Sequence, residues 1–152
     1  MIEEGEAVPK FQLQNADGNT VKSSQLKGKK FVVYFYPRDF TPGCTTEADE
    51  FSKDYKKFQK EGIEIIGISK DDVTSHRKFC DKMKIPYILL ADVETEVCKK
   101  FGVWGLKKFM GREFMGINRS TFLVNEKGKI FKVYPKVKPK GHSKEVLEAF
   151  QK

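Results

Sequence analysis

One of the three cysteines, Cys44, stands where a reactive thiol is useful. It follows an apolar run, residues 31–36, whose β-branched and aromatic composition predicts a strand buried on both faces. Pro37 ends that strand, and an acid-rich segment with helical periodicity begins at Thr45. The sequence therefore places Cys44 at a helix N-terminus, where unpaired backbone N–H groups and the helix dipole favour a thiolate.

The chemistry of such a thiolate is nucleophilic, because the ionised sulfur attacks and the protonated thiol does not. Sites of this kind can lower a cysteine pKa from about 8.5 to between about 3.5 and 7.5. A buried, inert cysteine at a strand-to-helix turn would give the same local pattern. The residues around the cysteine leave both interpretations open.

A longer pattern surrounds this cysteine: a proline, three residues, a threonine, two residues and the cysteine, filled by Pro37, Thr41 and Cys44. This pattern resembles the peroxiredoxin signature. Three further segments resemble the bacterioferritin comigratory protein branch, also called peroxiredoxin Q: residues 43–48, 104–111 and 116–124. The resemblance covers nearly the whole chain and implies one thioredoxin-like α/β domain over residues 1–152. It also implies a peroxidase acting on hydrogen peroxide and organic hydroperoxides.

The resemblance implies a role for each residue of the site. Cys44 would be the peroxidatic nucleophile, and the forked, permanently charged guanidinium of Arg119 would hold its thiolate and polarise the peroxide. The Thr41 hydroxyl would accept a hydrogen bond from the peroxide while donating toward the thiolate. Pro37, which has no N–H, would wall the pocket. Glu47 would help to set the arginine network, or is simply a carboxylate favoured in a first helical turn.

Oxidation of Cys44 gives a sulfenic acid, which a second thiol can convert to a disulfide. Many members of the branch carry that resolving cysteine five residues later, where this chain has Asp49. Residues 79–86 resemble the segment that carries it in another subset, which favours Cys80 and an intramolecular disulfide recycled by a thioredoxin-like reductant. Cys80 also fits a buried helical stripe, which leaves a one-cysteine peroxidase with an external resolving thiol as the alternative. We interpret Cys98 as a buried bystander.

Two other thiol-based functions fit the residues less well. A thioredoxin-type disulfide reductase needs two cysteines separated by two residues, and Glu47 occupies the second position. A metal site could use His76 and Cys80 from one helix face together with Cys44, but structural zinc needs four ligands at recognisable spacing. The only other histidine, His142, lies in a lysine-rich segment. We therefore expect no metal and no haem or flavin cofactor.

The net charge of +8 would also suit a function of a different class. The chain could be a non-catalytic basic module that binds nucleic acid or an acidic partner. Residues 127–144 contain seven lysines and no acid. Lys127 and Lys129 flank a turn, Lys132 alternates with apolar residues as on a solvated edge strand, and the lysines of 136–140 belong to a proline-rich loop. The acidic N-terminus and the lack of an apolar run of about 20 residues predict a cytoplasmic protein without a membrane partner. We expect a monomer, since no long exposed apolar stretch is predicted.

The remaining pattern alternates strands and helices, which predicts a mixed sheet covered by helices. The pattern first predicts a hairpin over 11–21 turning at Asp17-Gly18 and a helix closed by Gly62. It then predicts buried strands over 63–68 and 87–90, helices over 73–83 and 94–101, two antiparallel strands meeting at Gly128, and a helix over 144–151 capped by Ser143. The resemblance implies a loop over 104–111.

Overall fold

The computed structural model describes all residues, 1–152. Its elements, in chain order, are β1 (Gln12–Asn15), β2 (Thr20–Lys22), the 3₁₀ helix η1 (Ser23–Leu26), β3 (Lys30–Phe35), α1 (Pro42–Lys60), β4 (Ile63–Ser69), α2 (Val73–Met83), β5 (Ile88–Ala91), α3 (Glu96–Phe101), β6 (Trp104–Phe109), β7 (Arg112–Ile117), β8 (Ser120–Val124), β9 (Ile130–Tyr134) and α4 (His142–Phe150). None of these helices is long and apolar enough to cross a membrane.

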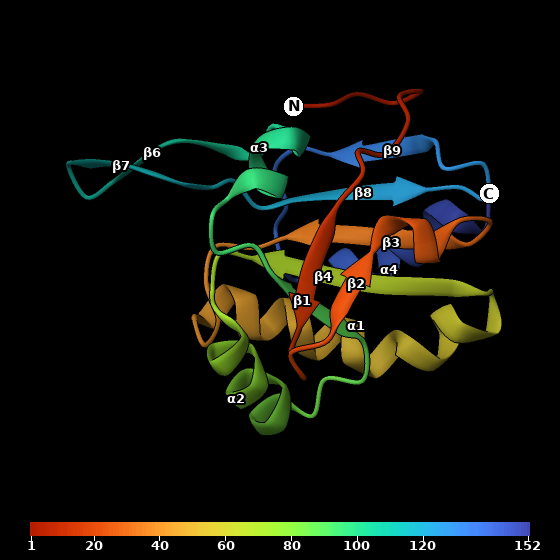
Figure 1. Cartoon of the computed structure of the whole chain (residues 1–152), viewed down its shortest axis with the longest axis horizontal. Helices are drawn as coiled ribbons and strands as arrows, with labels where there is room; N and C mark the ends of the chain where they lie inside the picture. The colour runs from red at the N-terminus through yellow and green to blue at the C-terminus, as the bar shows by residue number, and fades with distance from the viewer.

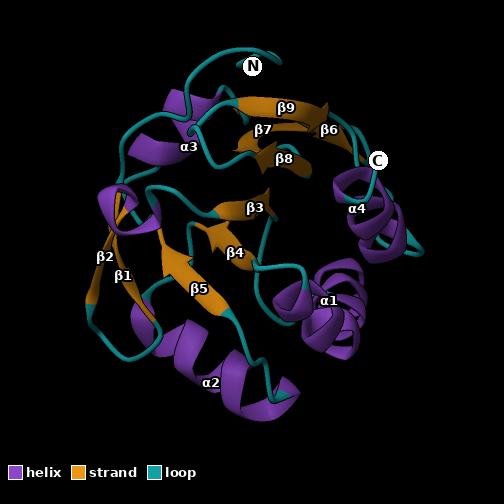
Figure 2. Ribbon diagram, turned by 90° about the vertical axis from the view of Figure 1, so that its right-hand side faces the viewer, coloured by secondary structure: helices purple, strands orange, loops and turns teal.

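A seven-stranded sheet in the order β2-β1-β5-β4-β3-β8-β9 forms the centre of the molecule (Figure 1). Strands β3, β4 and β5 are parallel, and the other neighbours pair antiparallel. Helices α1, α2 and α4 cover one face, and α3 and η1 lie on the other (Figure 2). This arrangement confirms the predicted mixed sheet flanked by helices and the N-terminal hairpin.

The central strand β3 supplies both hydrophobic cores by alternation. Its odd-numbered residues, Phe31, Val33 and Phe35, join the cluster beneath α3, whereas Val32 and Tyr34 join the cluster beneath α1 and α2. Successive side chains of a strand point to opposite faces, so a strand buried on both sides needs an apolar residue at every position. This requirement explains the uncharged, apolar run over residues 31–36.

The register of β3 against β8 brings two distant segments to one place. Phe35 at the end of β3 pairs with Ser120 at the start of β8, and these strands run antiparallel. The residue before Ser120 is Arg119, and the chain after Phe35 turns through Pro37 into α1. The sheet therefore places Arg119 beside the segment that leads to Cys44.

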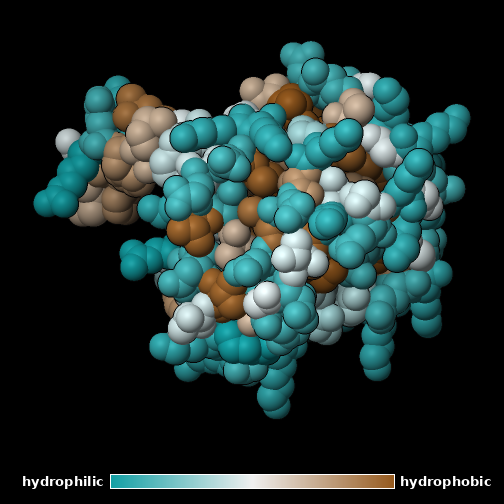
Figure 3. All heavy atoms as spheres, in the orientation of Figure 1, coloured by the Kyte–Doolittle hydropathy of each residue, from teal (hydrophilic) through white to brown (hydrophobic).

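Residues 104–111 are not the loop that the resemblance implies. Strands β6 and β7 form a separate two-stranded hairpin that projects from the body (Figure 1), turning at Met110 and Gly111 with φ of 50° and 79°. The hairpin exposes five apolar side chains (Figure 3): Leu106, Phe109, Met110, Phe114 and Met115. The expectation of no exposed apolar stretch is therefore wrong.

The last helix begins earlier than predicted. Gly141, with φ of 80°, is the N-cap of α4, and Ser143 lies inside the helix. The Ser143 hydroxyl donates to a carboxylate oxygen of Asp54 in α1 at 2.8 Å. The predicted cap residue therefore joins α4 to α1, and the helix starts on a glycine that reaches the left-handed conformation without a Cβ clash.

Strand β9 is an edge strand of the sheet, as the lysine pattern predicts. Within the sheet it pairs only with β8, and on its outer side Ile130 exchanges backbone hydrogen bonds with Gly5 and Glu6. Lys132 on this strand is exposed, while Ile130 is buried. Lysines on an edge strand discourage pairing with another chain, which accounts for this part of the basic segment.

Candidate active site

Cys44 is the third residue of α1. Thr41 is the N-cap and Pro42 occupies the first helical position, which suits proline because the N–H there has no intrahelical acceptor. The Cys44 side chain is buried, with 2% of its surface exposed. The thiol therefore sits beneath the first turn of a helix whose unpaired N–H groups favour negative charge.

A single guanidinium bridges Cys44 to the next turn of α1. Arg119 donates from Nη2 to Sγ of Cys44 at 3.3 Å and from Nη1 to Oε1 of Glu47 at 2.7 Å. Burial opposes the charged form of Arg119, but the charges of Glu47 and Cys44 outweigh it and raise the pKa of Arg119. The cation is thus held ionised and aimed at the sulfur.

The carboxyl group of Glu47 is almost fully buried, with 1% exposed. Its Oε1 accepts from Arg119, whereas its Oε2 has no hydrogen-bond partner. Burial raises the pKa of Glu47 to about 7 although Arg119 lowers it. The Glu47 carboxyl consequently changes charge near neutral pH, next to the residue that contacts Cys44.

Glu47 should make stability depend on pH in a way that Glu47→Gln abolishes. Between pH 4.5 and 7 the folded state retains a proton that the unfolded chain has released, so the free energy of unfolding falls as pH rises. The loss amounts to about 3 kcal/mol and is complete above pH 7. Urea unfolding of both proteins at pH 4 and pH 8 should show Glu47→Gln gaining by this amount relative to the parent. A pH-independent difference would contradict the prediction.

Thr41 contributes less than the resemblance implies. Its hydroxyl donates to the carbonyl oxygen of Arg38 at 2.8 Å. A hydroxyl has one proton, so Thr41 does not donate toward Cys44 in this conformation. The oxygen remains an acceptor for a substrate O–H. Pro37 lies half-buried at the start of the same loop.

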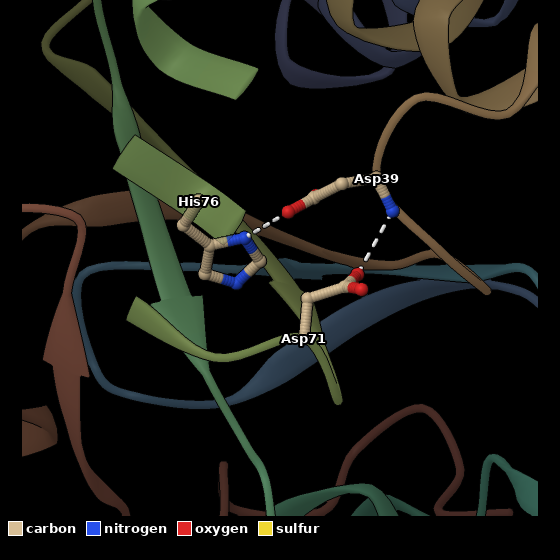
Figure 4. Close-up of side chains that lie close together, drawn as sticks. All are labelled: Asp39, Asp71 and His76. Atoms are coloured by element: carbon tan, nitrogen blue, oxygen red, sulfur yellow. Dashed lines mark hydrogen bonds and ion pairs between the residues drawn. The ribbon is translucent and has the colours of Figure 1, made fainter. Parts of the chain in front are cut away.

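The same loop is tied to α2 through Asp39 (Figure 4). One oxygen of the buried Asp39 carboxylate accepts a hydrogen bond from the Tyr36 hydroxyl at 2.6 Å. The other oxygen accepts from the Ser75 hydroxyl at 2.8 Å and also lies 2.7 Å from Nδ1 of His76. Nε2 of His76 faces the carbonyl oxygen of Leu90 at 3.0 Å. Both ring nitrogens of His76 therefore face oxygen atoms.

Asp39, Asp71 and His76 form a cluster of residue types that can hold a metal ion. Asp71 accepts from the backbone N–H of Asp39 at 2.8 Å and from the Ser69 hydroxyl at 2.6 Å. The ligand atoms therefore already bond to protein groups. His76 does not join Cys80 and Cys44 in the site that the sequence left open, because its ring is engaged by Asp39.

Comparison with known proteins gives a consistent answer. Residues 5–133 match the AhpC/TSA family. Peroxiredoxin Bcp of Bacillus subtilis is 45% identical over 150 residues, which is 99% of this chain and 96% of that protein. This chain is a peroxiredoxin of the AhpC/TSA family.

Similar solved structures belong to the bacterioferritin comigratory protein, or peroxiredoxin Q, branch. The bacterioferritin comigratory protein of Xanthomonas campestris, studied for alkyl peroxide reduction, has a TM-score of 0.88 and 36% identity, covering 93% of this chain and 90% of that one. A cysteine-to-serine mutant of Xylella fastidiosa PrxQ has a TM-score of 0.94 and 31% identity, covering 99% and 96%. The fold is thioredoxin-like and the activity is that of a peroxidase.

The other two cysteines of this peroxiredoxin differ in surroundings. Cys80 on α2 lies in the same hydrophobic cluster as Cys44, and burial raises its pKa to about 11. Cys98 on α3 lies in the cluster on the other face of the sheet, and burial together with Asp92 raises its pKa. All three thiols are free. Only Cys80 therefore shares a core with Cys44.

Sequence reasoning missed Gly43, which lets Arg119 lie over the first turn of α1. A Cβ at Gly43 would stand 3.0 Å from Nη2 of Arg119 and 3.6 Å from Cγ of Pro139. A glycine in the first turn of a helix does not by itself indicate a functional site. Its role becomes clear only when the position of the Arg119 guanidinium is known. Gly43 is thus part of the site although it carries no chemistry.

Gly43→Ala should separate activity from stability. Alanine is favoured over glycine in a helix by about 0.5–1 kcal/mol, so the melting temperature should stay level or rise. The new methyl group pushes the guanidinium away from its place beside Cys44 by a small distance, so peroxide reduction should slow severalfold. Stopped-flow peroxide reduction and a thermal melt on the same sample test this. A parent-like rate would contradict it.

Proposed function

We propose that this peroxiredoxin reduces hydrogen peroxide and organic hydroperoxides at Cys44, forms an intramolecular disulfide with Cys80 and is recycled by a thioredoxin-like protein. The observation that carries the proposal is the Arg119 bridge, in which one guanidinium contacts both the Cys44 sulfur and the Glu47 carboxylate. A buried thiol with a directed cation and an unpaired helix N-terminus has the surroundings of a reactive cysteine.

The oxidation step uses only residues of this loop and strand. The Cys44 thiolate attacks one peroxide oxygen, so an S–O bond forms while the O–O bond breaks. The electron pair leaves on the other oxygen, which takes up a proton and departs as water or an alcohol. Arg119 offsets the developing negative charge, and the Thr41 oxygen accepts from the substrate O–H. Pro37 walls the pocket, and Glu47 orients Arg119.

The second step joins Cys80 to the Cys44 sulfenic acid with loss of water. In the folded conformation the Cys80 thiol stays protonated at neutral pH, because its pKa is about 11, and it is then a poor nucleophile. Both sulfurs are also buried, where a reductant cannot reach them. We therefore expect the first turn of α1 and part of α2 to unwind before the disulfide forms.

A relative supports the choice of Cys80. Serine mutants of two cysteines of Xanthomonas campestris peroxiredoxin Q have been solved, and those two positions have the same separation in sequence as Cys44 and Cys80. The proposed cycle needs a single chain, no haem, flavin or metal, and a reducing compartment such as the cytoplasm. A dithiol reductant of the thioredoxin type would return both cysteines to thiols.

Stopped-flow mixing with peroxide tests the assignment in four proteins. Cys44→Ser should abolish oxidation, and Cys80→Ser should form the sulfenic acid but lose recycling by thioredoxin. Cys98→Ser is the matched control and should keep both steps. Mass mapping after one equivalent of peroxide should find a Cys44–Cys80 bridge.

Each alternative predicts a different outcome of the same experiment. A Cys44–Cys98 bridge would defeat the choice of Cys80. Sustained turnover of Cys80→Ser with an added thiol would indicate a one-cysteine peroxidase. Peroxide turnover that survives Cys44→Ser would place the reactive group elsewhere in the chain.

A further inference from the structure

A second cation reaches toward this centre from the projecting hairpin. Lys107 lies on β6 opposite Phe114. Its side chain crosses Gly116, where a Cβ would stand 3.0 Å from Cδ of the lysine. Its Nζ donates to the carbonyl oxygen of Ile117 at 2.9 Å. Lys107 therefore folds back toward the base of the hairpin instead of extending into solvent.

The base of the hairpin is also the segment that presents Arg119. Ile117, the acceptor of the Lys107 bond, is two residues before Arg119. The intervening Asn118 donates its backbone N–H to the carbonyl oxygen of Val103 at 2.8 Å. These two bonds engage both polar atoms of the single peptide unit between Ile117 and Asn118, where β7 leads into β8.

The charges around Lys107 show which groups it faces. Burial and the charge of Arg119 lower the pKa of Lys107, while the charge of Cys44 raises it. Both groups therefore lie within electrostatic range of the ammonium, and Glu47 in α1 is bound to Arg119. On the hairpin itself, the register puts Arg112 on the same face as Lys107.

We infer that Lys107 is a positioning residue of the peroxidatic centre, which fixes the backbone presenting Arg119 and adds a second positive charge that favours ionised Cys44. The inference rests on the proposed function of Cys44. An ammonium group has three N–H donors, and the bond to Ile117 uses one of them. The ammonium group therefore keeps two further donors and its charge within electrostatic range of Arg119 and Cys44.

The hairpin offers a matched control. Lys108 is the next residue, points to the other face and pairs with Glu113 at 3.6 Å, with 75% of its side chain exposed. Lys107→Met removes the charge and the hydrogen bond, Lys107→Arg keeps the charge, and Lys108→Met removes an equal charge from the same strand. The measurement is the rate of Cys44 alkylation by iodoacetamide between pH 5 and 9, resolved by peptide mass spectrometry.

Lys107→Met should slow alkylation of Cys44 at pH 7 by about 3- to 10-fold and move its pH profile to higher pH. Lys107→Arg should recover most of the rate, and Lys108→Met should stay within about twofold of the parent, because exposed charges are screened. The peroxide reduction rate should follow the same order. Salt should diminish the difference between Lys107→Met and the parent.

Three results would overturn the inference: a Lys107→Met profile that coincides with the parent, a Lys108→Met profile equal to that of Lys107→Met, or a lower melting temperature of Lys107→Met with an unshifted profile. The last result would mean that the lysine acts only on the structure of the hairpin. Failure of the proposed function is separate, because it would appear as peroxide turnover in Cys44→Ser, whereas alkylation needs no peroxide.

Discussion

Replacement of Arg119 by methionine is expected to slow peroxide reduction by about 10²- to 10³-fold, the loss typical of removing one preorganised donor from a buried reaction centre. Arg119 donates to Cys44 Sγ and to Glu47 from different nitrogens of one guanidinium. Methionine fills a similar volume but carries neither charge nor donors. The thiolate would then lose its cation, and the breaking O–O bond would lose the group that offsets its charge.

Arg119→Lys distinguishes charge from geometry. Lysine keeps a positive charge but lacks the planar fork, so it cannot serve the sulfur and Glu47 with the same fixed spacing. Its rate should lie between those of the parent and Arg119→Met. Single-turnover kinetics with excess peroxide measures the step directly. A rate for Arg119→Met within about threefold of the parent would show that the contact at 3.3 Å does not assist the reaction.

Local signals in the sequence were enough for much of the fold. The helix predicted over 73–83 has those bounds in the structure, because the Asp72 carboxylate accepts from the Ser75 N–H at 2.8 Å and caps it. The strand over 31–36 was readable because both of its faces are buried. For the site, the residues gave Cys44 a helix N-terminus, but only the resemblance brought Arg119 to it.

The hairpin of β6 and β7 could not be read in the same way. A strand can be predicted from alternating polar and apolar residues when one of its faces is buried. This hairpin projects from the body and exposes apolar and charged residues on both faces, so it lacks that pattern. Lys107 therefore looks like one of two adjacent surface lysines. Its role depends on Gly116 and Ile117 of the partner strand, which the sequence places near it only once the register is known.

The buried pair of Asp39 and His76 is the other feature beyond sequence reasoning. The two residues are 37 positions apart and meet only because α2 packs beside the loop that follows β3. The sequence placed His76 on the helix face that also carries Cys80, without indicating Asp39 as its partner. Phe40, which has a left-handed φ of 66°, also joins this loop to α2. Its ring packs edge-to-face with that of Phe79, with the ring centroids 5.1 Å apart.

His76→Leu should destabilise the folded protein by about 2–5 kcal/mol, because it leaves a buried oxygen of Asp39 and the carbonyl oxygen of Leu90 without the imidazole. Ser75→Ala removes only one hydrogen bond to the same carboxylate and should cost less, about 1.5 kcal/mol. The double change Asp39→Asn with His76→Leu removes the stranded charge and should recover part of the loss. Urea unfolding of the four proteins at pH 7 measures the series, and a cost for His76→Leu below that of Ser75→Ala would contradict it.

The same substitution should affect the two chemical steps differently. His76 joins the loop before Cys44 to the helix that carries Cys80, so breaking the pair lowers the cost of separating them. Sulfenic acid formation occurs in the folded conformation and should keep its rate. Disulfide formation requires local unwinding and should become severalfold faster, since destabilising a native contact that must open lowers that barrier. Following both steps by intrinsic fluorescence after one equivalent of peroxide tests this, and equal slowing of both steps would show that the pair supports the peroxide site itself instead of restraining its opening.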